Sequence, residues 1–341
     1  MTQVVGVTNG RTVTMESWGA PDGMPIFLLH GTPGCRKGPR PRTSVLYRLG
    51  VRLISYDRPG YGMSGRHHGR SVVDAADDVR AIADALDLAR FGVVGRSGGG
   101  PHALACAALL GDRVQNAAVL VGLAPSDAED LKWYDGMTES NVEEYAAADE
   151  AQTAIETRLA DWAERVRADP ESLLESLAPE LTRPDRRIVD DVAIRRLLTD
   201  TYAEALRESA DGWVDDVLAL RRPWGFDLSS ITSPVLIWHG ADDRFSPVEH
   251  ARWLARQIPT SVIKVQAGTA HFGAVEILPR VLAWCKESRN SERLRVQRTD
   301  QPAVAAQHGD VGVIGPDQRR QLIDDQAAFL AGFGDPALLL R

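Results

Sequence analysis

Cysteine is scarce in this sequence. The three that occur, Cys35, Cys106 and Cys285, lie far apart, and no Cys-x-x-Cys pair is present. An odd number at these spacings predicts neither a disulfide framework nor a cysteine-based metal site. The sequence also lacks any motif typical of a metal or cofactor site. We therefore expect chemistry that needs neither a metal ion nor a cofactor.

Long apolar runs are missing as well. No run approaches the roughly 20 apolar residues that a membrane-spanning helix needs, and residues 1–10 lack the basic and apolar regions of a secretory signal. The formal net charge of −8 argues against polyanionic partners, because nucleic-acid binding depends largely on basic contacts to phosphates. We expect a cytoplasmic protein that acts on a small-molecule substrate, without a nucleic-acid or membrane partner.

The chain has 341 residues, enough for one large α/β domain with an insertion or for two domains. It begins with a predicted hairpin, in which residues 4–7 and 12–18 flank the turn dipeptide Asn9-Gly10. Short apolar runs follow, which suit strands buried on both faces of a parallel sheet. These runs are residues 26–29, 51–56, 91–94, 114–121, 235–238 and 262–265.

Helical periodicity is predicted between the apolar runs, at residues 72–88, 101–110, 248–257 and 272–286. Strand and helix in alternation predict a mostly parallel, doubly wound α/β sheet. Between residues 125 and 226 no strand is predicted, and helical periodicity with many acidic residues indicates a helical cap inserted between two core strands. Its aromatic residues either fill the core of the insertion or face a site. They are Trp133, Tyr134, Tyr145, Trp162, Tyr202 and Trp213.

These patterns divide the chain into an α/β core of residues 1–124 and 227–287, a cap of residues 125–226 and a C-terminal extension of residues 288–341. The stretch from 287 to 318 is polar with weak periodicity, which is typical of an extended or loosely ordered tail. A short amphipathic helix is predicted after it, with Leu322, Ile323, Ala327, Leu330 and Phe333 on its apolar side. Docking on the core, joining a homo-oligomer and disorder all stay open for the extension.

The strongest chemical signal is Gly95-Arg96-Ser97-Gly98-Gly99, a G-x-S-x-G pattern between a predicted strand and a predicted helix of small residues. That context is typical of a nucleophile elbow, a sharp strand-to-helix turn that exposes a serine. Glycine is needed there because the strained turn leaves no room for neighbouring Cβ atoms. The helix N-terminus also offers N–H groups to developing negative charge. We predict that Ser97 is a nucleophile.

A serine hydroxyl needs an adjacent base, and His271 is the best placed of the eight histidines. It follows the last predicted strand, at the sheet edge where open α/β folds bind ligands. A carboxylate must then orient the imidazole. Asp242 and Asp243 follow the preceding strand, and either one fits this role or that of a helix cap. The remaining histidines in the core are interpreted as structural: His30, His102, His239 and His250.

Acyl transfer also needs N–H donors directed at the negatively charged oxygen of the tetrahedral intermediate. Residues 29–34, Leu-His-Gly-Thr-Pro-Gly, follow a predicted strand. A loop rich in Gly and Pro beside the elbow can supply one donor. Gly98, the residue after the predicted nucleophile, can supply the other.

With these motifs in place, the chain resembles the α/β-hydrolase superfamily, specifically its serine enzymes with a helical cap. Residues 30–34 resemble the H-G-x-P-G oxyanion loop, which implies that the backbone N–H of Thr32 partners that of Gly98. Residues 57–64 resemble the structural turn D-x-x-G-x-G-x-S, and residues 240–247 resemble G-x-x-D-x-x-x-P, which implies Asp243 rather than Asp242. The resemblance covers about residues 20 to 287, and its order of nucleophile, acid and base matches the one found here.

The serine at the elbow limits the chemistry, because dehalogenases and epoxide hydrolases of this superfamily use aspartate there. The resemblance implies a hydrolase that acts on a small carboxylic ester through an acyl-enzyme. In that reading His271 activates Ser97 and Asp243 orients His271. The backbone N–H groups of Thr32 and Gly98 stabilise the oxyanion.

Two alternatives stay open. One is an aminopeptidase resembling proline iminopeptidases, which hold a substrate ammonium with acidic cap residues; against it, Thr32 stands where that family prefers glycine. The acidic candidates in this cap are Glu139, Glu143, Glu144, Asp149 and Glu150. The other is a non-hydrolytic ligand-binding member of the fold, or a lyase or haloperoxidase with an intact triad.

Two residues beside the motifs are interpreted as structural. Arg96 either meets an anionic substrate group or, in the reading we favour, forms an ion pair behind the elbow with Asp57 or Asp77. Cys35 borders the oxyanion loop and is expected to be a packing residue, since nothing near it in the sequence indicates a reactive thiolate.

Overall fold

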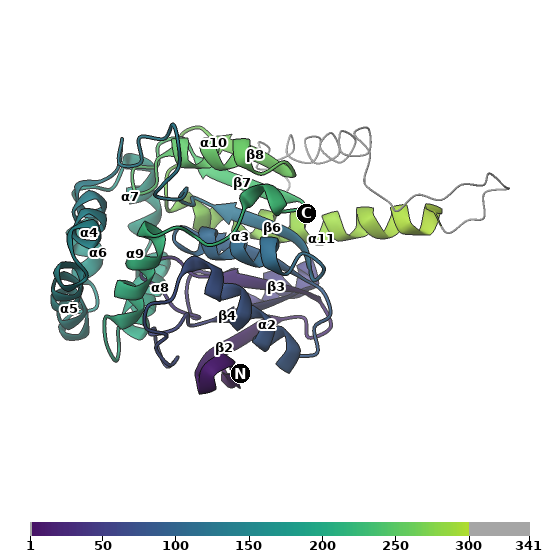
Figure 1. The fold of residues 1–341 in the computed structure, drawn as a ribbon, viewed down its shortest axis with the longest axis horizontal. Coiled ribbons are helices and arrows are strands. Elements are labelled where there is room, and N and C mark those ends of the chain that lie inside the picture. The colour runs from purple at the N-terminus through teal and green to yellow at the C-terminus, as the bar shows by residue number, and fades with distance from the viewer. Residues whose placement is uncertain (1, 300–341) are drawn as a thin grey trace.

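The computed structural model describes the backbone of residues 2–299 and the side-chain surroundings of residues 2–287. The described residues form one sheet with the strand order β1-β2-β4-β3-β5-β6-β7-β8 (Figure 1). Strand β2 pairs antiparallel with β1 and with β4, and all other neighbours pair parallel. The predicted mostly parallel α/β sheet is confirmed. The strands are β1 Thr2–Gly6, β2 Thr12–Gly19, β3 Met24–Leu29, β4 Val51–Tyr56, β5 Phe91–Arg96, β6 Val114–Leu120, β7 Val235–Gly240 and β8 Ser261–Gln266.

The predicted N-terminal hairpin is formed by β1 and β2. Asn9 and Gly10 in its connection have positive φ angles of 63° and 71°. These are the angles that an Asn-Gly dipeptide adopts readily and most other residues avoid. The turn signal in the sequence therefore marks the reversal of the chain.

Different helices cover the two faces of the sheet. Successive strand residues point to opposite faces, and in β3 Phe27 belongs to one buried cluster and Leu28 to the other. Helices α2 Ala75–Ala85, α3 Gly99–Leu109 and α10 Val248–Gln257 contribute to the cluster of Phe27, whereas α1 Thr43–Leu49 and α11 Gly273–Thr299 contribute to that of Leu28. Burial on both faces explains why the central strands are apolar throughout.

A helical insertion separates β6 from β7. Within the described residues no strand lies in this stretch, and Figure 1 shows the helices gathered on one side of the molecule, beside the core. The chain leaves β6 at its carboxyl end, so the insertion is attached at the sheet edge where open α/β folds bind ligands. Its helices are α4 Glu139–Glu150, α5 Gln152–Ala168, α6 Ser172–Leu177, α7 Arg183–Val189, α8 Val192–Ala205 and α9 Asp211–Arg221.

The predicted extended tail begins too early. Helix α11 continues to Thr299, so the prediction is wrong for residues 287–299. The residues after Glu287 include many Arg with Glu, Leu and Gln, which favour helix, and no Gly or Pro interrupts them. The rest of the extension, with the predicted helix around residues 322–333, lies outside the described residues. No helix in the described part is long and apolar enough to cross a membrane.

Candidate active site

Ser97 lies in a sharp turn between β5 and α3. Its φ angle is 51°, a left-handed conformation that costs energy for any residue other than glycine. Two hydrogen bonds of 2.8 Å hold the turn: the Ser97 N–H donates to the Leu120 carbonyl, and the Gly100 N–H donates to the Ser97 carbonyl. The turn has the geometry of a nucleophile elbow, and it presents the serine at the carboxyl end of a central strand.

Glycines make the turn possible. A Cβ atom added at Gly95 would overlap the carbonyl oxygen of Gly99, and one added at Gly99 would overlap the carbonyl oxygens of Leu29 and His30. These are backbone atoms, which cannot rotate away as the end of a flexible side chain can.

We expect Gly95→Ala to lower the free energy of unfolding by about 3 kcal/mol, the upper end for an overpacked site. Gly6→Ala in β1 is the matched control, since a methyl group there meets no atom within 4 Å. Chemical denaturation of both variants measures the difference. Equal unfolding free energies for the two variants would contradict the packing argument.

His271 and Asp243 lie together, in the loops that follow β8 and β7. The Nδ1 atom of His271 is 2.9 Å from Oδ2 and 3.2 Å from Oδ1 of Asp243. Asp243 is buried, and its Oδ1 also accepts the backbone N–H groups of Phe245 at 2.9 Å and Ser246 at 3.0 Å. Asp242, the other candidate from the sequence, is exposed. The arrangement leaves Nε2 of His271 as the nitrogen that is not directed at the carboxylate.

The charge of Asp243 is strongly stabilised. Burial by itself would raise its pKa, but the neighbouring His271 and the hydrogen bonds from His239 and His271 outweigh burial and hold the pKa well below its usual range. The carboxylate therefore stays ionised at neutral pH. A carboxylate at this distance from Nδ1 holds the imidazole ring of His271 in one orientation.

His239 is a site residue that the sequence did not reveal. It lies at the end of β7 with its Nε2 atom 3.3 Å from Oδ2 of Asp243 and 2.6 Å from the carbonyl oxygen of Ser246. It therefore packs a second imidazole against the same carboxylate. Strand β7 is buried along its whole length, so no alternation of polar and apolar residues indicates which side of the strand faces the site.

Thr32 and Gly98, the predicted oxyanion donors, lie next to each other. A Cβ atom at Gly98 would overlap Oγ1 of Thr32. Gly98 is the N-cap of α3, where backbone N–H groups have no partner within the helix. The carbonyl oxygen of Gly98 lies 2.8 Å from Nδ1 of His102, which holds the peptide group in place.

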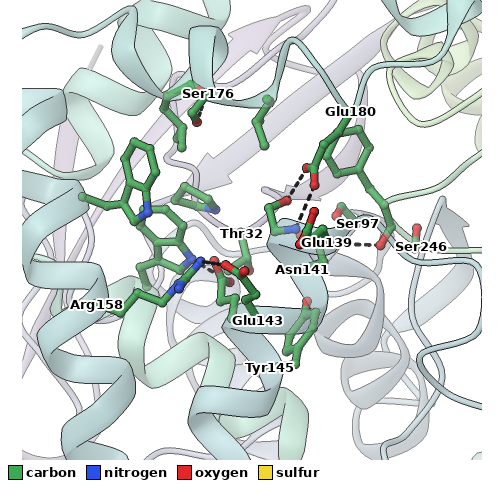
Figure 2. Close-up of a pocket in the computed structure, with 18 of the residues that line it drawn as sticks. Thr32, Ser97, Glu139, Asn141, Glu143, Tyr145, Arg158, Ser176, Glu180 and Ser246 are labelled. Carbon is green, nitrogen blue, oxygen red and sulfur yellow. Dashed lines mark hydrogen bonds and ion pairs between the residues drawn. The ribbon is translucent and has the colours of Figure 1, made fainter.

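Ser97 and Thr32 line a cavity of about 410 Å³ between the core and the helical insertion. Figure 2 shows both residues together with the insertion residues that face them. On the core side, Ser246 also lines the cavity, and its hydroxyl oxygen is 3.5 Å from Nδ1 of His271. Four aromatic residues of the insertion line it as well: Tyr145, Trp162, Tyr202 and Trp213. Trp133 instead packs edge-on against Tyr145, with ring centroids 4.9 Å apart.

The cavity is acidic. Four carboxyl groups line it, of which Glu143 pairs with Arg158 at 2.6 Å (Figure 2) and Glu180 accepts the Ser140 N–H at 2.8 Å. The other two are Glu139 and Glu144. The remaining acidic candidates of the sequence lie elsewhere, since Asp149 pairs with Arg221 and Glu150 is exposed.

Glu144 differs from the other acidic residues of the cavity. Its hydrogen-bond partner is the Nε1–H of Trp213 at 3.0 Å, and no cation among the described residues pairs with it. Burial raises its pKa to about 7. The group is therefore available to a hydrogen-bond donor or a cation that enters the cavity.

The expected ion pair of Arg96 is wrong. Asp57 pairs with Arg36, and Asp77 pairs with Arg80. No carboxylate of the described residues pairs with Arg96, and burial lowers the pKa of its guanidinium. The sequence gives the positions of charged residues along the chain, but it does not show which of them become ion-pair partners in the folded protein.

His30, the first residue of the oxyanion loop, and Cys35, the residue after the loop, are both buried. Burial raises the pKa of the Cys35 thiol, which makes it unreactive. His30 accepts the Arg58 N–H on Nε2 at 3.1 Å, and its Nδ1 is 2.8 Å from the Gly31 carbonyl oxygen. Both of its nitrogens are thus used within the fold. Within the described residues no group of His, Cys, Asp or Glu side chains is placed to hold a metal ion.

Comparisons with known proteins agree on one family. Residues 24–276 match the sequence profile described as alpha/beta hydrolase fold. The chain is 27% identical over 272 residues to the AB hydrolase superfamily protein YisY of Bacillus subtilis, covering 79% of this chain and 92% of that protein. It is 25% identical over 248 residues to the bifunctional esterase/perhydrolase DCH of Acinetobacter calcoaceticus, covering 72% and 83%.

Solved structures show the same fold. The bromoperoxidase from Bacillus anthracis superposes with a TM-score of 0.62 at 21% identity, over 87% of this chain and all of that one. A thermophilic esterase from Thermogutta terrifontis superposes with a TM-score of 0.59 at 22% identity, over 87% of this chain and 98% of that one.

Proposed function

Since this chain belongs to the α/β-hydrolase family, we propose that it is a serine hydrolase that cleaves small carboxylic esters through an acyl-enzyme. The observation that carries the proposal is the hydrogen-bonded pair of Asp243 and His271, combined with a serine in a strained elbow that lines the acidic cavity. A relative named as an esterase/perhydrolase supports the choice of ester chemistry.

In the proposed reaction the Ser97 oxygen attacks the ester carbonyl carbon while Nε2 of His271 takes the hydroxyl proton. Asp243 stabilises the resulting imidazolium, and the N–H groups of Thr32 and Gly98 stabilise the oxyanion. His271 then protonates the departing alcohol. A water molecule, deprotonated by His271, attacks the acyl-enzyme, and the acid leaves as Ser97 regains its proton.

The contact between Ser97 and His271 must tighten during this reaction. Among the described residues no hydrogen bond joins the Ser97 hydroxyl to His271. Such catalytic contacts are often long in free enzymes and shorten when the substrate binds.

A panel of p-nitrophenyl esters, from acetate to octanoate, tests the proposal. We expect turnover, with a preference for short or medium acyl chains that the cavity of about 410 Å³ can enclose. A fluorophosphonate probe should label Ser97, as identified by mass spectrometry of the modified peptide. Labelling without turnover of any ester would move the proposal to another acyl substrate, and absence of both would contradict a serine nucleophile.

A second candidate function is an aminopeptidase, and Glu144 is the observation that favours it. A carboxylate in the cavity of the proposed nucleophile, with no ion-pair partner among the described residues, suits the ammonium group of an amino-acid substrate. Proline β-naphthylamide, compared with the neutral esters, separates the two functions directly.

If amine-bearing substrates bind Glu144, their KM should fall as the pH rises through about 7. The sign follows from the raised pKa: the carboxyl group is neutral below this pH and becomes an anion above it. We expect Glu144→Gln to raise this KM about tenfold at pH 8, the worth of one charged hydrogen bond, and to remove its dependence on the charge of Glu144.

The control for this experiment is Glu150→Gln, on the same helix but exposed and outside the cavity. Its KM values should match those of the wild type. An unchanged KM for amine-bearing substrates in Glu144→Gln would exclude Glu144 as their binding group.

A further inference from the structure

Asp216 lies on α9 of the helical insertion, and its side chain is 0% exposed. Its carboxylate meets donors from core segments that are far away in the sequence. Arg58 donates to both carboxylate oxygens, Arg70 donates to Oδ1 at 2.6 Å, and the Tyr61 hydroxyl donates to Oδ2 at 2.9 Å. An insertion residue thus sits at the centre of a buried polar cluster of the core.

The same carboxylate contacts the oxyanion loop directly. The Thr32 hydroxyl donates to Oδ2 of Asp216 at 2.7 Å. Arg58, which is held by Asp216, donates to the carbonyl oxygens of His30 and Gly31 and lies 3.2 Å from Oγ1 of Thr32. The loop is therefore fastened at three successive residues, and the last of them carries the proposed donor N–H.

The second proposed donor is also close to this cluster. Nε2 of His102 is 3.8 Å from Oδ1 of Asp216, and its Nδ1 is 2.8 Å from the carbonyl oxygen of Gly98. Oγ1 of Thr32 occupies the space that a Cβ atom on Gly98 would take. Asp216 consequently holds the Thr32 side chain, which in turn lies directly against Gly98.

Stability alone is a weak reason for such a cluster. The cost of removing charges from water offsets much of the attraction in a buried ion pair. What the cluster supplies instead is fixed geometry, since each of its groups contacts two or more partners. The insertion has a second buried carboxylate beside it, Asp215, which binds Arg66 at 2.9 and 3.0 Å and forms no hydrogen bond with the oxyanion loop in the described part of the chain. Asp216 is therefore one of several contacts that attach α9 to the core.

We propose that Asp216 is a positioning residue that sets the direction of the Thr32 and Gly98 N–H groups, so that the insertion completes the oxyanion hole of the core. The proposal rests on the serine hydrolase function inferred above. It assigns the helical insertion a part in the reaction in addition to forming the wall of the cavity.

The test compares Asp216→Asn with Asp215→Asn, two changes at neighbouring buried carboxylates of one helix. For Asp216→Asn we expect kcat, per active site titrated with fluorophosphonate, to fall about 100-fold, the cost of displacing a catalytic group by an ångström. KM should stay close to that of the wild type, because the interaction strengthens only in the transition state. Asp215→Asn should keep its kcat and lose only thermal stability.

Thr32→Val is a second test, which remains informative if Asp216→Asn does not fold. Valine keeps the shape of the side chain and the backbone N–H, and it leaves the pairs of Asp216 with Arg58 and Arg70 in place. We expect a fall in kcat in the same direction, and weaker inhibition by a trifluoromethyl ketone, whose adduct with serine places an oxyanion in the hole. A structural role alone would change the melting temperature but neither of these readouts.

The outcomes separate the two proposals. Wild-type turnover with an unchanged kcat in both Asp216→Asn and Thr32→Val would overturn the role of Asp216 and leave the esterase function intact. If the wild type cleaves no ester, the rate at which fluorophosphonate labels Ser97 still decides the question, because its attack also needs the hole. Slower labelling in the two variants would then support Asp216, and equal labelling would overturn it.

Discussion

Replacing Ser97 with alanine should lower kcat for a p-nitrophenyl ester by about 10⁴-fold or more, the scale on which serine enzymes lose activity without their nucleophile. The acyl-enzyme cannot form without the hydroxyl oxygen, and only binding and the oxyanion donors remain to assist water. Alanine tolerates the φ angle of 51° no worse than serine does. The melting temperature should therefore stay near that of the wild type, and a loss of activity would report on chemistry rather than on folding.

Steady-state kinetics and fluorophosphonate labelling measure this effect. Ser126→Ala is a suitable control, because this hydroxyl donates to the Arg221 carbonyl and does not line the cavity. Turnover by Ser97→Ala at a rate near that of the wild type would contradict covalent catalysis at this position.

The second large effect is expected for Asp243→Asn, which should lower kcat by about 10⁴-fold. The amide cannot stabilise the imidazolium, and its NH₂ group favours the wrong tautomer of His271. The variant should also be less stable than the wild type, because the Asp243 carboxylate accepts hydrogen bonds from the Phe245 and Ser246 N–H groups.

Asp242→Asn provides a matched control one residue away. This side chain is exposed, so its kcat and melting temperature should remain close to those of the wild type. A similar loss of kcat in both variants would mean that the orienting carboxylate has been assigned to the wrong residue.

The low pKa of Asp243 has a visible consequence for pH profiles. A carboxyl group with a depressed pKa contributes its stability above its unfolded pKa, about 4 for Asp, and loses the contribution only as the pH falls through the folded value. Activity should consequently not decline through protonation of Asp243 at any pH between 5 and 8.

Much of the fold follows from the sequence because its central strands are buried on both faces. The runs at 51–56 and the helix at 248–257 coincide with β4 and α10, since an unbroken apolar run and a clear amphipathic stripe each allow one interpretation. The elbow was recognisable for a different reason. Only glycine fits where Gly95 and Gly99 meet the neighbouring backbone. The steric requirement of the turn therefore appears directly as a sequence motif.

The contacts that the sequence did not reveal are those between distant segments. In the sequence, Asp216 and Asp185 cannot be distinguished from the acidic residues of solvent-exposed helices, although the structure buries both. Asp185 fits the pattern of a helix cap, and Thr182 does bind it at 3.0 Å, yet it also accepts the Phe272 N–H beside His271 at 2.8 Å. The residue pattern of a helix indicates which side chains lie on each of its faces. It does not indicate which residues of other segments those side chains contact.

The buried carboxylates of α7 and α9 have a consequence for protein engineering. A chimera that carries the insertion of a relative would gain a different lining for the substrate cavity. It would also lose the contacts that this insertion makes with the core. Unless aspartates at positions 185 and 216 come along, with partners for Thr32, Arg58 and Arg70, the graft should yield a slow catalyst with a lower melting temperature, because buried arginines would lose their carboxylate. On the proposed role of Asp216, a change of insertion would alter substrate scope and catalytic rate together.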